Sequence, residues 1–295
     1  MRNRMGRMNP LYEPLARWYD QHARDLPWRR RTATPWGVLV SEIMLQQTPA
    51  NRVIPYWEKW MSAWPTPGDL AQATPGEVIQ AWGSLGYPRR ALRLRECAIA
   101  IEEEYGEVPR TEESLRTLPG IGEYTAAAVE AFAYGGRTVV LDTNIRRVIS
   151  RAYAGEALPM PHLTSAERGM AASLVPQDPA DSVKWNQATM ELGAVICRAR
   201  DADCDSCPVK DLCAWREADY PGDLHAGRRR TQSWEGTDRQ ARGRIMAYLR
   251  EADGESVPIA AILAGTPREE QTLRSIDALI ADGLARRDGE ALRLP

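Results

Sequence analysis

Hydrophobic residues along most of the chain recur every three or four positions, which is the spacing of one face of an α-helix. Leu11, Leu15 and Trp18 give the first such face, and proline opens several of the later segments, as is typical of a first helical turn. Up to about residue 225 the pattern predicts helices and no strands, at 11–24, 35–45, 49–60, 74–82, 88–105, 112–117, 125–134, 145–153, 165–174 and 183–196.

The last 60 or so residues follow a different pattern. A proline–glycine pair at 221–222 and an arginine run at 228–230 are typical of a linker. Three short helices are predicted beyond it, at 239–251, 259–264 and 269–282. Residues 284–294, with Asp288-Gly289 in their middle, predict a hairpin. Three helices followed by a hairpin indicate a small winged helix-turn-helix domain.

Composition narrows the class of protein. The chain has 295 residues, of which 43% are hydrophobic, enough for two or three domains. No run of 18 uncharged apolar residues occurs and the basic N-terminus lacks the apolar core of a signal peptide, so we expect a cytoplasmic protein without a membrane span. The three histidines are far apart in sequence, which excludes a histidine-rich metal site.

Four of the five cysteines lie within 17 residues, at Cys197, Cys204, Cys207 and Cys213. In a cytosolic protein such a cluster favours a metal centre over disulfides. Only one pair has the close C-x2-C spacing, so the pattern favours a 4Fe–4S cluster over zinc, with buried free thiols as a third alternative. Cys97 lies between apolar neighbours and is expected to be a small core residue.

Two carboxyl groups are candidates for acid–base chemistry. Glu42 lies among apolar residues, where desolvation raises the pKa of a carboxyl and suits it to donate a proton. Asp142 precedes a predicted helix, where an N-cap position favours the anion. One acid and one anion are what cleavage of a glycosidic bond requires, although an ordinary helix cap and a solvated glutamate remain alternatives.

Glycine and arginine supply candidate phosphate contacts. The run LPGIG at 118–122 separates two predicted helices, so the backbone amides near Gly120 and Gly122 are candidates for binding an anion, or form an ordinary turn. Residues 1–31 hold eight arginines against three acids, and further arginines cluster at 89–95, 146–151 and 228–230. Because the whole chain has a net charge of −2, any nucleic-acid surface must be a local patch.

Together these features resemble one family, the adenine-specific mismatch DNA glycosylases (MutY family) of the helix-hairpin-helix superfamily. The resemblance rests on the four cysteines and on the runs DLPWR (25–29), SEIMLQQT (41–48), WGSLGY (82–87), LPGIGEYTA (118–126) and LDTN (141–144). It implies an all-α, two-lobed fold and a 4Fe–4S cluster. The implied domains are 1–34 with 138–227 around the cluster, a helical barrel at 35–137, and a linker with a winged-helix-like α+β domain at 228–295.

The resemblance also implies a base-excision-repair enzyme that flips adenine, mispaired with 8-oxoguanine or guanine, out of double-stranded DNA. Glu42 then protonates the base and Asp142, positioned by Asn144, stabilises the oxocarbenium sugar. Tyr124 stands where the lyase branch of the superfamily has a Schiff-base lysine, which implies a monofunctional enzyme. The family pattern matches the remaining DNA-contacting and pocket-lining positions to Gln47, Tyr87, Trp28, Arg29, Arg198 and Arg200. The expected protein is a monomer associated with the nucleoid.

Two departures from the family pattern are visible. Pro88-Arg89 follows Gly86-Tyr87 where the family has tyrosine and serine, and about 65 residues beyond the linker are too few for the Nudix-like domain that recognises 8-oxoguanine. The alternatives are therefore a glycosylase for another mispaired base, such as thymine opposite guanine, and a non-catalytic iron–sulfur DNA-binding regulator.

Overall fold

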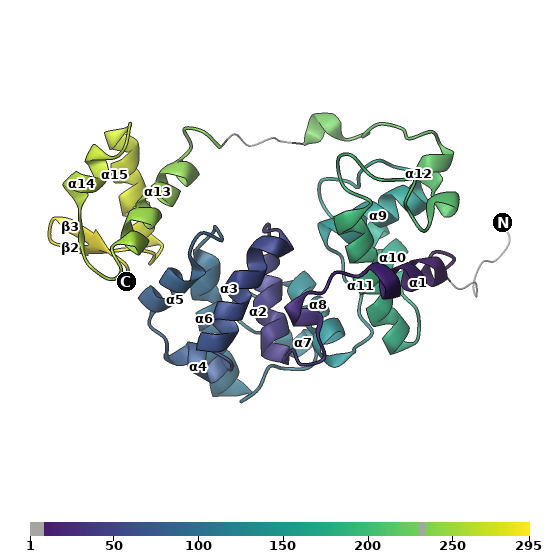
Figure 1. The fold of residues 1–295 in the computed structure, drawn as a ribbon, viewed down its shortest axis with the longest axis horizontal. Helices are drawn as coiled ribbons and strands as arrows, with labels where there is room; N and C mark the ends of the chain where they lie inside the picture. The colour runs from purple at the N-terminus through teal and green to yellow at the C-terminus, as the bar shows by residue number, and fades with distance from the viewer. Residues whose placement is uncertain (1–8, 230–233) are drawn as a thin grey trace. The chain divides into compact units, whose positions relative to one another are not determined.

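The computed structural model describes residues 9–229 and 234–295, which form two compact, mainly helical units (Figure 1). The first unit contains the described residues up to 30, residues 110–113 and residues 122–229. The second contains residues 31–109, 114–121 and 234–295. The domain boundaries expected from the sequence stay a prediction, since units defined by packing need not coincide with them. Arg2, Arg4, Arg7 and Arg230, which belong to the predicted basic clusters, lie outside the described residues.

The first unit is built around one long helix, α11. Its helices are α1 (Tyr12–His22), α8 (Glu123–Tyr134), α9 (Thr143–Ile149), α10 (Ser165–Leu174), α11 (Pro179–Val195) and α12 (Ala214–Glu217). Short turns occur at Pro27–Arg29, Ser150–Ala154, Lys210–Leu212 and Ala226–Arg228. Trp185 of α11 and Leu15 of α1 are buried in the shared core. The helix predicted at 145–153 ends earlier, since its last turn widens at Ser150–Ala154.

Helix α9 approaches α11 closely at Gly193. A Cβ atom on Gly193 would lie 2.7 Å from the Cβ of Asn144, nearer than two side chains can come. The absence of a side chain at Gly193 therefore permits the contact between the two helices.

The second unit begins with a bundle of helices (Figure 1). They are α2 (Pro35–Leu45), α3 (Ala50–Ala63), α4 (Pro67–Gln72), α5 (Pro75–Trp82) and α6 (Arg89–Glu104), while α7 (Glu112–Leu115) spans the boundary between units. The hydroxyl of Thr34 accepts from the amide of Gly37 and Pro35 follows it, so α2 starts where the sequence predicts. Nearly every residue of α2 is buried, which makes it the central helix.

Helix α4 was not predicted, although its start signal is present in the sequence. Thr66 and Asp69 form a capping box around Pro67, as Thr74 and Glu77 do around Pro75 at the start of α5. The six residues of α4 are too few to show a helical period, so only the capping signal could have identified this helix from the sequence.

The C-terminal part of the second unit confirms the expected winged-helix-like architecture. It contains α13 (Asp238–Glu251), β1 (Val257–Pro258), α14 (Ile259–Ala264), α15 (Glu269–Ala281), β2 (Arg286–Asp288) and β3 (Ala291–Arg293). The predicted hairpin is β2–β3, with Arg287 opposite Leu292. The strand β1 was not predicted, and it pairs antiparallel with β3 to give the order β1-β3-β2.

This C-terminal part packs on α5. Ile79 of α5 belongs to the same buried cluster as Ile245 and Leu249 of α13. The side chain of Gln80 donates to the carbonyl of Arg250 at 2.9 Å. A Cβ on Gly76 would lie 2.5 Å from the carbonyl oxygen of Pro295, so the chain end sits directly against this glycine. Within the part of the chain that the structure describes, no helix has the length and apolar character to cross a bilayer.

The carboxylate of Glu191, fully buried in α11, holds the segment after α1. It accepts from Arg24 Nε at 2.6 Å and Nη2 at 3.0 Å, and from Arg29 Nη1 at 2.8 Å. Burial alone would raise the pKa of Glu191, but the bonds and charges of these two arginines outweigh burial and lower it. The ion pairs therefore stabilise the fold only while Glu191 is ionised.

Glu191→Gln is expected to lower the free energy of unfolding at pH 7 by about 2–4 kcal/mol, because two arginines would lose a buried counter-charge. A lowered pKa in the folded state gives stabilisation that is complete above the unfolded value, about 4.3, and is lost as the pH falls further. Urea unfolding of both proteins between pH 7 and pH 3 measures this. Because the variant lacks this carboxyl, the difference between the curves should shrink below pH 4. A constant difference would contradict the assignment.

Candidate functional site

Asp142 is the N-cap of α9, as predicted. Its Oδ1 accepts from the amide of Ile145 at 2.6 Å, and its Oδ2 accepts from the Asn144 side chain at 2.7 Å. Both carboxylate oxygens are therefore held in fixed directions by donors from one helical turn.

The electrostatic balance at Asp142 differs from the sequence prediction. Burial raises the pKa of this carboxyl, and the bonds from Ile145 and Asn144, together with the charge of Arg147, lower it by less. The net direction is upward, although an N-cap position alone favours the anion. The carboxylate is thus oriented by hydrogen bonds but poorly solvated, so a nearby cation would strengthen its ionised form.

Arg147 connects Asn144, which holds Asp142, to the cysteine loop, and the sequence did not indicate this role. Its Nη2 donates to Asn144 Oδ1 at 2.8 Å and to the Gly193 carbonyl at 2.6 Å, while its Nε donates to the Cys197 carbonyl at 2.7 Å. The side chain is buried. One guanidinium therefore fixes the orientation of the Asn144 amide and the start of the cysteine loop.

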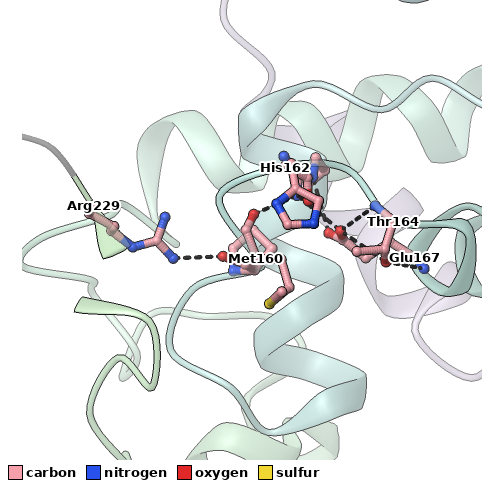
Figure 2. A network of polar contacts seen from close by, with 7 residues as sticks. Met160, His162, Thr164, Glu167 and Arg229 are labelled. Atoms are coloured by element: carbon pink, nitrogen blue, oxygen red, sulfur yellow. Dashed lines mark hydrogen bonds and ion pairs between the residues drawn. The ribbon is translucent and has the colours of Figure 1, made fainter. Parts of the chain in front are cut away.

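The sequence offered the arginine cluster at 146–151 as a candidate DNA surface. The structure shows instead that these arginines are engaged inside the first unit. Arg147 and Arg151 are buried. Arg146 pairs with Glu167 at 3.0 Å and donates to the carbonyl oxygens of Met160 and His162. Figure 2 shows the labelled residues of this network, with Glu167 beside Thr164 and Arg229 approaching from the linker side. The cluster holds loops within the first unit.

All four cysteines of the predicted centre line one pocket, together with Arg151 and Trp215. Arg151 Nη1 lies 3.3 Å from Cys197 Sγ, and its guanidinium stacks 4.3 Å from the Trp215 ring. Burial raises the pKa of Cys204, and the neighbouring thiols of Cys197 and Cys213 raise it further. Burial raises the pKa of Cys207 to about 12.

This donor set fits an iron–sulfur group, since such clusters take four thiolates. A bound cation centre would supply the charge that offsets burial and thiolate repulsion. Among the described residues, no set of three or more histidine, cysteine or acidic side chains is arranged to hold a single metal ion.

Glu42 lies in the second unit, on α2. Its side chain is only 5% exposed, and Val40 and Met44 beside it are fully buried. The predicted burial of this carboxyl among the residues of α2 is therefore confirmed. Helix α2 ends at Leu45, three residues after Glu42, and the chain then turns into an exposed loop.

Gln47 and Tyr87 lie on two loops that the second unit holds together. Both side chains are exposed, and both residues have a left-handed backbone, with φ of 57° at Gln47 and 49° at Tyr87. This conformation is uncommon for residues other than glycine. The hydroxyl of Thr48 donates to the carbonyl of Leu85 at 3.4 Å, which joins the loops directly. Two residues 40 positions apart are thus presented by neighbouring turns.

Arg90, at the start of α6, links the same loops more strongly. Its Nη1 donates to the carbonyls of Ile43 at 2.8 Å and Gln46 at 2.6 Å, and its Nη2 donates to Gly86 at 3.1 Å. Burial lowers the pKa of Arg90 to about 10, so the guanidinium remains charged at neutral pH. It closes the end of α2, where carbonyl groups lack helical partners.

The two glycines of the predicted hairpin have different local roles. Gly120 has φ of 79°, and a Cβ there would lie 3.1 Å from the Arg93 Cβ, so both backbone conformation and space favour glycine. Gly122 is the N-cap of α8, and no atom lies within 4 Å of the position its Cβ would occupy. A side chain at Gly122 would therefore extend into open space.

The other predicted site residues are in the first unit. Trp28 is buried, and Arg29 is engaged by Glu191 rather than free. Arg198 and Arg200 are exposed in the cysteine loop. Tyr124, on α8, lines a second pocket with Leu141, the residue before Asp142.

Residues 40–170 match the HhH-GPD superfamily of base excision DNA repair proteins. The helical fold, the glycine hairpin and the four-cysteine loop define a DNA glycosylase of the helix-hairpin-helix type, and the chain belongs to this superfamily. Within it the chain belongs to the adenine DNA glycosylase family. The protein is thus an enzyme of base excision repair.

Two relatives carry this assignment. The adenine DNA glycosylase of Mycolicibacterium smegmatis is 46% identical over 92% of this chain and 90% of its own length. That of Mycobacterium tuberculosis is 44% identical over 92% and 89%. A solved thermostable thymine-DNA glycosylase has 30% identity and a TM-score of 0.63, and the match covers 70% of this chain and 95% of that chain.

Arg90→Met is expected to destabilise the protein by about 2–4 kcal/mol, because the carbonyls of Ile43, Gln46 and Gly86 would lose a charged donor. Arg93→Met is the matched control, since Arg93 is exposed and paired with Glu96 on the same helix. Urea unfolding of the two variants compares them. Equal stability would mean that Arg90 does not hold the two loops.

Proposed function

We propose that this protein removes adenine mispaired with 8-oxoguanine or guanine by acid-assisted hydrolysis of the N-glycosidic bond. The observation that carries the proposal is the setting of Asp142, whose two oxygens are oriented by Ile145 and Asn144 in a poorly solvated place. Such a carboxylate is suited to stabilise a positively charged sugar. The positive charge would in turn favour the ionised form of Asp142, which burial disfavours. The choice of adenine is supported by the names of the two mycobacterial relatives.

Glu42 is proposed as the general acid that protonates the adenine, and its burial supports this role. Asn144, fixed by Arg147, positions Asp142. Tyr124 replaces the Schiff-base lysine of the lyase branch, and a phenol cannot form an imine, so we expect base release without strand cleavage.

The DNA contacts are proposed from the exposed and strained positions. Gln47 and Tyr87 would enter the base stack, which suits their exposed side chains on linked loops. The backbone amides near Gly120 and Gly122, at the N-terminus of α8, would bind a phosphate. Arg198 and Arg200 would contact the backbone from the cysteine loop. Trp28 and Arg29 would line the base pocket, although Arg29 also donates a hydrogen bond to Glu191.

We propose that Cys197, Cys204, Cys207 and Cys213 hold a 4Fe–4S cluster, because all four line one pocket. The raised pKa values of the Cys204 and Cys207 thiols mean that a cationic partner would favour their thiolate forms. The cluster would organise the loop that carries Arg198 and takes no part in base chemistry. The protein would act as a monomer on mispaired duplex DNA, in association with the nucleoid.

A thymine glycosylase is the second candidate, favoured by the similarity to a thymine-DNA glycosylase structure. Duplexes containing A:8-oxoguanine, A:G or T:G, incubated with the enzyme and then treated with hot alkali, distinguish the two. Cleavage of the adenine strand is expected in the first two duplexes. Cleavage of T:G alone would overturn the proposal.

Glu42→Gln is expected to lower the single-turnover excision rate by at least about 100-fold while duplex binding persists, because the amide cannot donate the proton. Asp142→Asn should lower the same rate by about 100- to 1000-fold, through loss of the negative charge near the sugar. Rates at saturating enzyme, with affinity measured separately, test both. A normal rate in either variant removes that residue from the mechanism.

The purified protein is expected to be coloured, with a broad absorption band near ~400 nm from thiolate-ligated iron. Cys204→Ser should reduce bound iron and this band, whereas Cys97→Ser, which alters a buried core thiol, should leave both unchanged. Iron analysis of the three proteins gives the result. A colourless wild-type protein with bound zinc would contradict the cluster.

A further inference from the structure

An exposed stack of two aromatic rings and one guanidinium lies in the second unit. The Arg239 guanidinium is 4.7 Å from the Trp234 ring centre and 5.1 Å from the Tyr87 ring centre, and its Nη1 donates to the Tyr87 hydroxyl at 2.9 Å. Trp234 is 49% exposed and Tyr87 is 43% exposed, which is unusual for rings of this size. Arg90 also lies over the Tyr87 ring.

The stack joins the loop that presents Tyr87 to the start of the winged-helix-like part. Trp234 precedes α13 and Arg239 lies in its first turn, and the hydroxyl of the N-cap Thr237 donates to the Trp234 carbonyl at 2.8 Å. Gln271 of α15 donates to the Gly236 carbonyl at 2.9 Å and to Asp238 at 2.8 Å. These bonds fix the turn that carries Trp234, and the bond from Arg239 to the Tyr87 hydroxyl joins this turn to the Tyr87 loop before any ligand binds.

Exposed aromatic rings interleaved with a guanidinium are the chemistry that proteins use for nucleic acids, since rings stack on bases and guanidinium groups bind phosphates. We propose that Trp234 and Arg239 extend the DNA-binding surface from Tyr87 onto the C-terminal part, where they contact duplex DNA beside the target nucleotide. This inference deepens the proposed function and rests on it, because Tyr87 is taken as a DNA contact. It assigns DNA binding to the small C-terminal part.

The helix that would read DNA in an ordinary winged helix is less suited to this ligand. Helix α15 begins with Glu269 and Glu270, which repel phosphate. Its exposed Arg274 is paired with Glu270 at 2.9 Å. The positive and aromatic side chains gather instead at the start of α13, so the C-terminal part would meet DNA through that end.

The test compares Arg239→Ala and Trp234→Ala with Arg274→Ala, a matched control in the same part of the chain that also removes one arginine. Fluorescence anisotropy of full-length proteins with labelled duplexes, one fully paired and one carrying A:8-oxoguanine, gives Kd. We expect each of the first two variants to raise Kd by about tenfold on both duplexes. Arg274→Ala should leave Kd unchanged, and the Tm of all three should match the wild type.

Three outcomes would overturn the inference. The first is an unchanged Kd in both stack variants, and the second is an equal rise in Kd in Arg274→Ala. The third is a raised Kd together with a lowered Tm, which would make the stack a packing contact only. Excision measured at saturating enzyme separates this inference from the proposed function. A wild-type protein that releases no base but whose Kd still depends on Arg239 and Trp234 would refute the glycosylase and retain the surface.

Discussion

One buried and one half-buried guanidinium group determine where the loops of the candidate site lie. A loop cannot bury its carbonyl oxygens without donors, and one arginine supplies up to five N–H groups in a fixed plane. Arg147 uses this geometry to join the Asn144 amide to the Cys197 carbonyl. Arg90 uses it to join the end of α2 to the loop before Tyr87. In both places, segments distant in sequence are held by charge-assisted bonds rather than by helix packing alone.

Exclusion of water also determines the properties of the two candidate carboxyl groups. Glu42 belongs to α2, a helix that is buried on nearly all sides, so water has little access to its side chain. Asp142 is also poorly solvated, but it receives directed bonds from a helix start and a neighbouring amide. Burial thus acts on both groups, and at Asp142 the bonds from Ile145 and Asn144 offset part of its effect. The proposed roles, Glu42 as acid and Asp142 as anion, follow from burial at the first and from directed donors at the second.

Local signals in the sequence predicted much of this arrangement. Proline and threonine fixed the starts of α2 and α5, and Asp142 was recognisable as a cap because an apolar segment precedes it and a helix follows. The arginines at 146–151 were harder, since sequence alone does not say which face of α9 meets α11. The contact of Arg239 with Tyr87 spans 152 positions and depends on how the C-terminal part packs, so no local pattern could indicate it.

The left-handed backbone at Gln47 and Tyr87 has a consequence for how the protein can change. Glycine adopts this conformation without strain, so replacing either residue by glycine relieves a local cost of about 1 kcal/mol or more while deleting the side chain. Selection for thermal robustness alone would therefore favour glycine at these two turns. The DNA contacts proposed for Gln47 and Tyr87 would oppose that tendency. A variant selected for heat resistance with glycine at either position is therefore expected to bind DNA less tightly.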